Sequence, residues 1–171
     1  LKRPGEPNAS VRGAFNQIQT YRREIPVGFT WNQITVLSDG VQARAATFTA
    51  NFEHYAPWKT IDGKELADPS MPEIETVLRG LFTPSVFLDV VRNFVVFADE
   101  FTGPVKKVAK YHQYWAVRKA VQRTLEAKDA DGRAGVVWHT QGSGKSLEMH
   151  CFAGAIMRHP GMANPTLVVL T

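Results

Sequence analysis

The 171-residue sequence predicts an α/β fold, because segments with the helical period alternate with short apolar segments of strand character. The clearest pattern lies near the C-terminal end, where a strand (135–138), a glycine loop (139–144), a helix (145–158) and a second strand (166–171) follow one another. This order is typical of a right-handed βαβ unit. A second pattern, a helix followed by two strands, lies within the first fifty residues. We therefore expect two parts of mixed helix and strand.

The N-terminal part begins with a predicted helix. Asn8 and Ser10 are candidate N-caps, apolar side chains recur at helical spacing over residues 11–25, and a proline then ends the pattern. Two strands, 34–37 and 43–50, follow and are joined by a short turn. Prolines and glycines punctuate residues 52–72, which we interpret as a loop and a domain boundary.

Helices are also predicted in the middle of the chain. Residues 73–81 form a short one, and a Thr-Pro pair supplies the cap and first-turn proline of another over residues 84–95. A broad face of residues 86–98 is expected to be buried, and a longer helix follows over 111–127. A basic run precedes that helix and comprises Lys106, Lys107 and Lys110. It fits contact with DNA phosphates and a solvated charged face equally well.

The composition is that of an ordinary globular protein, with 44% hydrophobic and 21% charged residues. No apolar stretch approaches the roughly 18 residues that a membrane-spanning helix needs, so we expect no membrane segment. The single cysteine, Cys151, excludes an internal disulfide and a cysteine zinc cluster and favours a cytoplasmic location. Its helical period predicts a buried, unreactive thiol. The net charge of +4 tolerates a polyanionic partner without identifying one.

The two ends suggest a piece of a longer polypeptide. The sequence opens with Leu1-Lys2-Arg3-Pro4 rather than with methionine or a targeting pattern, and it stops within the apolar run 166–171. A buried parallel strand of that kind needs neighbouring strands. We therefore expect an internal fragment whose active sites are divided between present and missing residues.

Residues 142–146, Gly-Ser-Gly-Lys-Ser, lie between a predicted strand and a predicted helix, where a glycine loop can wrap a phosphate. Glycines let successive N–H groups turn inward, Lys145 reaches the terminal phosphates, and Ser146 offers its hydroxyl to Mg²⁺. His139 stands where the longer motif has glycine, so the match is to the shorter form of helicase-like motors. A glycine-rich turn before a helix is the alternative. The expected nucleotide-binding residues of the loop are Thr140, Gln141, Gly142, Ser143, Gly144, Lys145 and Ser146.

Other chemistry is sparse in the sequence. No acidic pair at the end of another strand is present to hold the metal and position water, so this chain is expected to bind nucleotide better than it hydrolyses it. The histidines are scattered without acidic partners at metal-ligand spacing, and none is given a catalytic role. They are His54, His112, His139, His150 and His159.

Residues 137–146, together with the preceding 111–117, resemble the motor of the R (restriction) subunit of type I restriction-modification enzymes. Four upstream segments resemble, in the same order, the end of that subunit's nuclease domain and its exit toward the motor. They are residues 1–4, 14–21, 38–40 and 57–63. The resemblance therefore covers essentially the whole chain.

This resemblance implies the end of a restriction-endonuclease-like, PD-(D/E)xK domain followed by the start of a RecA-like P-loop motor domain. Residues 1–68 would be the C-terminal part of the nuclease domain, 69–108 a helical linker, and 109–171 the N-terminal part of the ATPase motor domain. The loop sequence alone would fit many superfamily 2 translocases. The ordered motifs on both sides of the loop favour the R subunit.

The resemblance also implies roles for single residues. Lys2 matches the lysine of a Glu-x-Lys nuclease motif whose acidic companions would lie before Leu1. Gln17 and Tyr21 match a Gln-x-x-x-Tyr motif, and their i,i+4 spacing puts both on one helix face. By spacing alone they would be a core tyrosine and its solvated neighbour. Gln113 matches the adenine-sensing glutamine of superfamily 2 motors, with a polar residue at a helix start as the alternative.

The implied function is that of an R subunit that translocates double-stranded DNA using ATP hydrolysis, with Mg²⁺, and cleaves it away from the recognition site. Its implied partners are the modification (methyltransferase) and specificity subunits of the restriction complex. One alternative is another superfamily 2 helicase or translocase without nuclease activity. The other is a non-hydrolysing ATP-binding scaffold.

Overall fold

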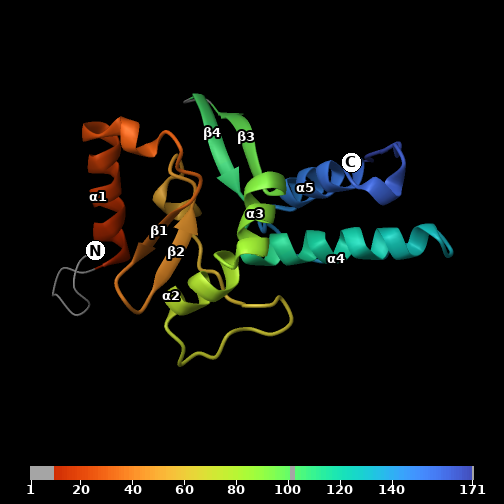
Figure 1. Cartoon of the computed structure of the whole chain (residues 1–171), viewed down its shortest axis with the longest axis horizontal. Helices are drawn as coiled ribbons and strands as arrows, with labels where there is room; N and C mark the ends of the chain where they lie inside the picture. The colour runs from red at the N-terminus through yellow and green to blue at the C-terminus, as the bar shows by residue number, and fades with distance from the viewer. Residues whose placement is uncertain (1–9, 101–102, 171) are drawn as a thin grey trace. The chain divides into compact units, whose positions relative to one another are not determined.

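The computed structural model describes residues 10–100 and 103–170, apart from the side chain of residue 100 (Figure 1). The chain divides into two compact units, one that ends at Tyr111 and one that begins at His112. The mixture of helices and strands agrees with the expected α/β character. Each unit has its own local architecture.

The first unit begins with helix α1 (Val11–Glu24). The Ser10 hydroxyl accepts a hydrogen bond of 3.0 Å from the backbone N–H of Gly13, which confirms the predicted N-cap. The helix ends where the sequence turns to proline, and a 3₁₀ turn, η1 (Pro26–Phe29), follows. The predicted first helix is therefore confirmed at both ends.

The predicted strand pair is confirmed as an antiparallel hairpin of β1 (Thr35–Ser38) and β2 (Ala43–Ala46). Helix α1 lies alongside it (Figure 1). The core between them consists of Val11, Leu37, Ala46 and Tyr55, with Phe15 edge-on to the Tyr55 ring at 5.7 Å. Strand β2 is shorter than predicted, because the chain turns directly after it and the N–H of Ala50 donates to the carbonyl of Thr47 at 3.1 Å. The hydroxyl of Thr49 in this turn donates to the carbonyl of Lys106 and accepts from its N–H.

The long loop after β2 returns to the hairpin at Glu73. The backbone N–H of Glu73 donates to the carbonyl of Val41 at 2.9 Å, and the carboxylate of Glu73 accepts from the N–H of Ala43 at 2.7 Å. Within the loop, the N–H of Ala67 donates to the carbonyl of Lys59 at 2.9 Å. The start of the next helix is thus fixed to the hairpin by two hydrogen bonds.

The middle helices begin where they were predicted. Helix α2 (Glu73–Thr76) continues as a π-helical turn, η3 (Val77–Leu81), and helix α3 (Pro84–Asn93) follows. Helix α3 ends before Val95 rather than at it, because the Phe94 N–H closes the last turn on Val90. The interpretation of one broad buried face over 86–98 is also wrong in part, since Leu88 is exposed and belongs to the outer side of α3.

Residues expected to form the end of a helical linker form a second hairpin instead. Strands β3 (Val95–Glu100) and β4 (Gly103–Val108) pair antiparallel, with Val95 opposite Val108 and Phe97 opposite Lys106. β-Branched and aromatic residues favour a pleated strand once a partner strand is available. The basic run therefore lies partly on a strand.

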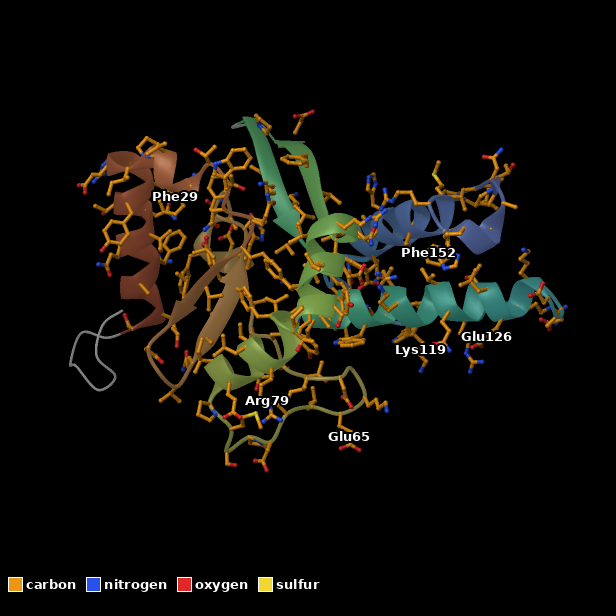
Figure 2. The ribbon with its side chains drawn as sticks, viewed as in Figure 1. Phe29, Glu65, Arg79, Lys119, Glu126 and Phe152 are labelled. Atoms are coloured by element: carbon orange, nitrogen blue, oxygen red, sulfur yellow. The ribbon has the colours of Figure 1, made fainter. Side chains whose placement is uncertain are left out.

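The second unit contains two predicted helices, α4 (Tyr111–Lys128) and α5 (Lys145–Met157), and a short turn, η4 (Pro160–Met162). Helices α4 and α5 lie side by side (Figure 1). The Gln113 amide contacts the loop before α5, and the Lys128 ammonium donates to the carbonyl of Gly161 at 2.7 Å. The two helices therefore run in the same direction. Figure 2 shows Phe152 projecting from α5, and Lys119 and Glu126 from α4.

The two strands predicted in this unit do not form. Residues 135–138 and 166–170 have no regular secondary structure and no ladder hydrogen bonds, and Trp138 and Leu170 are 87% and 91% exposed. An isolated strand leaves its N–H and C=O groups unpaired, and no other strand lies within the described part of this unit. Helices α4 and α5 and the segment before the glycine loop line an open groove of about 1000 Å³.

Candidate nucleotide-binding site

The glycine loop has the backbone that its sequence predicts. Gly142 and Gly144 have φ angles of +78° and +87°, which lie in the left-handed region, and helix α5 starts at the next residue. Residues with a Cβ adopt this region at a cost, so glycine is needed at both positions. A Cβ at Gly144 would also collide with the amide of Gln113. The turn therefore depends on glycine both for its conformation and for its close packing.

Lys145 and Ser146 lie in the first turn of α5 and are both exposed. The Lys145 ammonium donates to the carbonyls of His139 and Thr140 at 3.0 and 2.9 Å, so it is folded back over the loop. The N–H groups of Leu147 and Glu148 donate to the carbonyl of Gly144 at 2.9 and 3.3 Å, and the helix dipole gives this end of α5 a partial positive charge. The arrangement offers donors and positive charge to an anion.

The remaining loop residues suit the same ligand. The hydroxyl of Ser143 is buried without a hydrogen-bond partner among the described residues, which leaves it as a donor for an incoming acceptor atom. Thr140 and Gln141 are exposed on the outer part of the loop. The loop thus fits a phosphate group, with Ser146 as the only hydroxyl of the helix's first turn.

The side chain of Gln113 holds the backbone of the glycine loop, a contact that the sequence did not predict. Its side chain is buried, and its Nε2 donates to the carbonyls of Ser143 and Gly144 at 2.9 and 3.3 Å. The amide therefore ties the glycine loop to the first turn of α4. The sequence indicated a base-sensing amide, and the separation of 30 residues gave no sign of this backbone contact.

His139 also has a structural partner that sequence reasoning missed. Its Nδ1 lies 2.6 Å from a carboxylate oxygen of Glu148, whose side chain is 8% exposed. His112, in the first turn of α4, packs its ring edge-on against the ring of His139 at a centroid distance of 5.3 Å. A separation of nine residues across a turn matches no helix or strand period, so no pattern could have revealed the pair.

The expected nuclease residues belong to the first unit. Lys2 lies outside the described residues. Gln17 and Tyr21 share one face of α1, and the Gln17 Nε2 donates to the Tyr21 hydroxyl at 2.6 Å. Tyr21 is 42% exposed, so the alternative that it is simply a core residue is wrong. Their catalytic role stays a prediction.

Cys151 is buried in α5, as predicted, and burial raises the pKa of its thiol to about 11. Within residues 10–100 and 103–170, no three His, Cys, Asp or Glu side chains gather as a metal site. Over the same ranges, no helix has both the length and the apolar character needed to cross a membrane.

The second unit matches a known family over its whole length. Residues 112–171 match the SWI2/SNF2 ATPase family. The glycine loop, its lysine and helix α5 all lie within this match, so the second unit is similar to SWI2/SNF2 ATPase domains.

The rest of the chain identifies the family more closely. Residues 1–54 match the N terminus of the type I restriction enzyme R protein. The whole chain is 42% identical to the type I restriction enzyme HindI endonuclease subunit of Haemophilus influenzae and spans 17% of that protein's length. It is 29% identical, over 96% of its residues, to 17% of the putative MjaIXP endonuclease subunit of Methanocaldococcus jannaschii. A Staphylococcus aureus endonuclease subunit is 25% identical over 86% of the chain and 15% of its own length.

The chain belongs to the R (endonuclease) subunits of type I restriction enzymes. The order of the two matches, R-protein N terminus and then ATPase, is the order that the sequence motifs indicated. The chain spans about a sixth of the length of these relatives.

Proposed function

We propose that this chain is the part of a type I restriction R subunit in which the nuclease domain passes into the first motor domain. Residues 1–68 complete a PD-(D/E)xK nuclease, 69–108 connect it to the motor, and 109–171 open a RecA-like fold. The whole protein uses ATP to translocate double-stranded DNA and cleaves it away from the recognition site. It works with modification and specificity subunits, as its membership of the type I restriction R subunits implies.

The observation that carries the motor half is the glycine loop, with Lys145 and Ser146 directly after it at the start of α5. The loop N–H groups hold phosphate oxygens, and Lys145 moves from the carbonyls of residues 139 and 140 to the terminal phosphates. Ser146 provides a hydroxyl ligand for Mg²⁺, which neutralises phosphate charge when it is bound with the nucleotide. The Gln113 amide supports the loop, and its further role in this proposal is to sense adenine, as its match to the glutamine of superfamily 2 motors implies.

The nuclease half of the proposal is carried by Lys2, Gln17 and Tyr21. A lysine cation beside metal-binding carboxylates stabilises the charge that develops on a phosphodiester under attack by water. The hydrogen-bonded Gln17 and Tyr21 pair on α1 is exposed and available to the same substrate. Double-stranded DNA is thus the substrate of both halves.

Two lysine substitutions in the native protein test this function. Lys145→Ala should reduce ATP binding below detection in a titration, because it removes the cation that meets the phosphates, and ATP hydrolysis and DNA cleavage should fall with it. Lys2→Ala should abolish DNA cleavage while leaving ATP hydrolysis within about twofold, since nuclease and motor are separate domains. Lys64→Ala, an exposed lysine of the loop before α2, is the matched control and should change neither activity.

Each alternative function gives a different result. A Lys2→Ala protein that cuts DNA at the parental rate contradicts the nuclease half and leaves a motor without nuclease activity. A native protein that binds ATP without hydrolysing it supports the scaffold. Unchanged nucleotide affinity in Lys145→Ala contradicts the phosphate site itself.

A further inference from the structure

Helix α5 holds residue 139 at two points. The backbone carbonyl of His139 accepts a hydrogen bond from Lys145, in the first turn of α5. The imidazole of the same residue is bonded to Glu148, one turn further along the helix. Residue 139 is the first residue of the glycine loop, so these contacts fix the point at which the chain enters the loop.

The two contacts differ in what nucleotide binding does to them. The Lys145 ammonium is folded back onto the carbonyls of residues 139 and 140, so its side chain has to swing away from them to reach the terminal phosphates, and we expect its bond to the carbonyl of residue 139 to break at that step. The bond between His139 and Glu148 uses neither the lysine nor the loop N–H groups, so it persists. Of the two contacts between residue 139 and α5, the hydrogen bond between His139 and Glu148 is therefore the one that remains when nucleotide is bound.

We propose that His139 and Glu148 are a positioning pair that keeps the entrance of the glycine loop against α5 while Lys145 holds the nucleotide phosphates. The inference rests on the proposed ATP site and adds two residues that the phosphate-loop motif does not include. Neither residue touches the phosphates. Their effect passes through the placement of the loop backbone and of Lys145.

The environment of Glu148 supports this role. Its side chain is 8% exposed, and a buried carboxylate is costly unless it is hydrogen-bonded or paired. The imidazole Nδ1 and a carboxylate oxygen of Glu148 lie 2.6 Å apart, within hydrogen-bond distance, so each satisfies the other's buried polar atom. The ring of His112 from α4 packs edge-on against the imidazole and limits its rotation. The pair is therefore confined to one geometry.

The test measures ATP affinity and steady-state hydrolysis in the native protein and in four variants. Glu148→Ala and His139→Ala should each weaken ATP binding about tenfold, because the loop entrance is no longer held when Lys145 leaves it. The double variant should be no weaker than either single variant, since both remove the same bond. Glu148→Gln keeps an acceptor oxygen on a side chain of the same length and should bind ATP within about twofold of the parent.

The readouts separate positioning from general destabilisation. The ATP affinity and the KM for ATP should change more than kcat. Near-parental binding in Glu148→Gln, compared with weak binding in Glu148→Ala, would show that a hydrogen-bond acceptor at residue 148 is what matters. Glu126→Ala removes an exposed carboxylate of α4 and is the matched control, with no expected change (Figure 2). If His139→Ala strands the buried carboxylate and fails to fold, Glu148→Ala, Glu148→Gln and the double variant still decide the question.

Several outcomes would overturn the inference. Additive losses in the double variant, equal losses in Glu148→Gln and Glu148→Ala, or parental affinity in Glu148→Ala each contradict a positioning bond. A parent protein that binds no ATP contradicts the proposed function instead. The two failures are therefore distinguishable in one set of titrations.

Discussion

At the scale of single residues, burial decides which groups are reactive. Cys151 lies inside α5, and removal of its thiol from water raises the pKa from 9.0 to about 11. The thiolate is the reactive form, so a raised pKa suppresses reaction at every pH below about 11. The nearby guanidinium of Arg158 acts in the opposite direction, and burial outweighs it.

We therefore expect Cys151 to react with a disulfide reagent about a hundredfold more slowly in the folded chain than in urea at pH 8, because two pKa units lower the thiolate fraction by that factor. The rate is measured from the absorbance of the released thiolate. Raising the pH toward 10 should accelerate the folded-state reaction. Equal rates in folded and unfolded protein would contradict the buried position.

The residue scale also shows what the sequence can and cannot reveal about the site. Lys145 and Ser146 were predictable because the motif, the glycines and the helix start are adjacent in the chain. The contacts of Gln113 and His139 were not, because they join residues separated by 30 and 9 positions. Such contacts follow from packing, which a local pattern does not encode.

At the scale of elements, Gly80 marks a close approach between the π turn η3 and the preceding loop. A Cβ there would lie 2.5 Å from the carbonyl oxygen of Thr60 and 2.7 Å from the Trp58 ring. Backbone and a buried indole cannot move aside easily, so the substitution forces the turn and the loop apart.

Gly80→Ala should lower the free energy of unfolding by about 1–3 kcal/mol, the usual range for overpacking a buried position. Gly28→Ala in η1 is the matched control, since its Cβ would meet only the Ile25 methyl group at 3.8 Å. Its effect should stay within about 0.5 kcal/mol. Urea denaturation of both variants provides the measurement, and equal midpoints would contradict the close approach.

Element prediction succeeded where the cause is local. Helix α1 has its serine cap and its terminating proline, and α5 follows its glycine loop. The β3–β4 hairpin was missed because the apolar run after α3 continues the helical period, and only pairing with β4 gives it strand geometry.

At the scale of the whole molecule, two apolar segments whose sequences favour β-strands do not form strands in the structure. Residues 135–138 and 166–170 have no ladder hydrogen bonds in the described chain. Their prediction as strands required neighbours, and a parallel sheet forms only when several strands assemble. The mixture of helices and strands was therefore predictable from the sequence, whereas the predicted parallel sheet cannot form from these two segments alone.

Hydrogen exchange can test this dependence. In the 171-residue chain, amides of 135–138 and 166–170 should exchange at nearly unprotected rates, whereas α4 should be protected by its helical hydrogen bonds. In the native longer protein, the two segments should gain protection of at least about tenfold because they join a sheet. Unprotected segments in the native protein would contradict the predicted strands.

The two hydrogen bonds that fix Glu73 to the first hairpin have a consequence for how this family can vary. These bonds fix the start of α2 to the hairpin whatever the conformation of the loop between β2 and α2. Within that loop, the hydrogen bond from the N–H of Ala67 to the carbonyl of Lys59 closes a smaller loop over residues 60–66. Figure 2 shows Glu65 on this outer part, and residues 62–66 are exposed. Each doubling of loop length adds only about 0.6 kcal/mol of closure entropy. Insertions at residues 62–66 should therefore change the free energy of unfolding very little. An affinity tag or a fluorophore could be placed there without moving α2 or the β1–β2 hairpin.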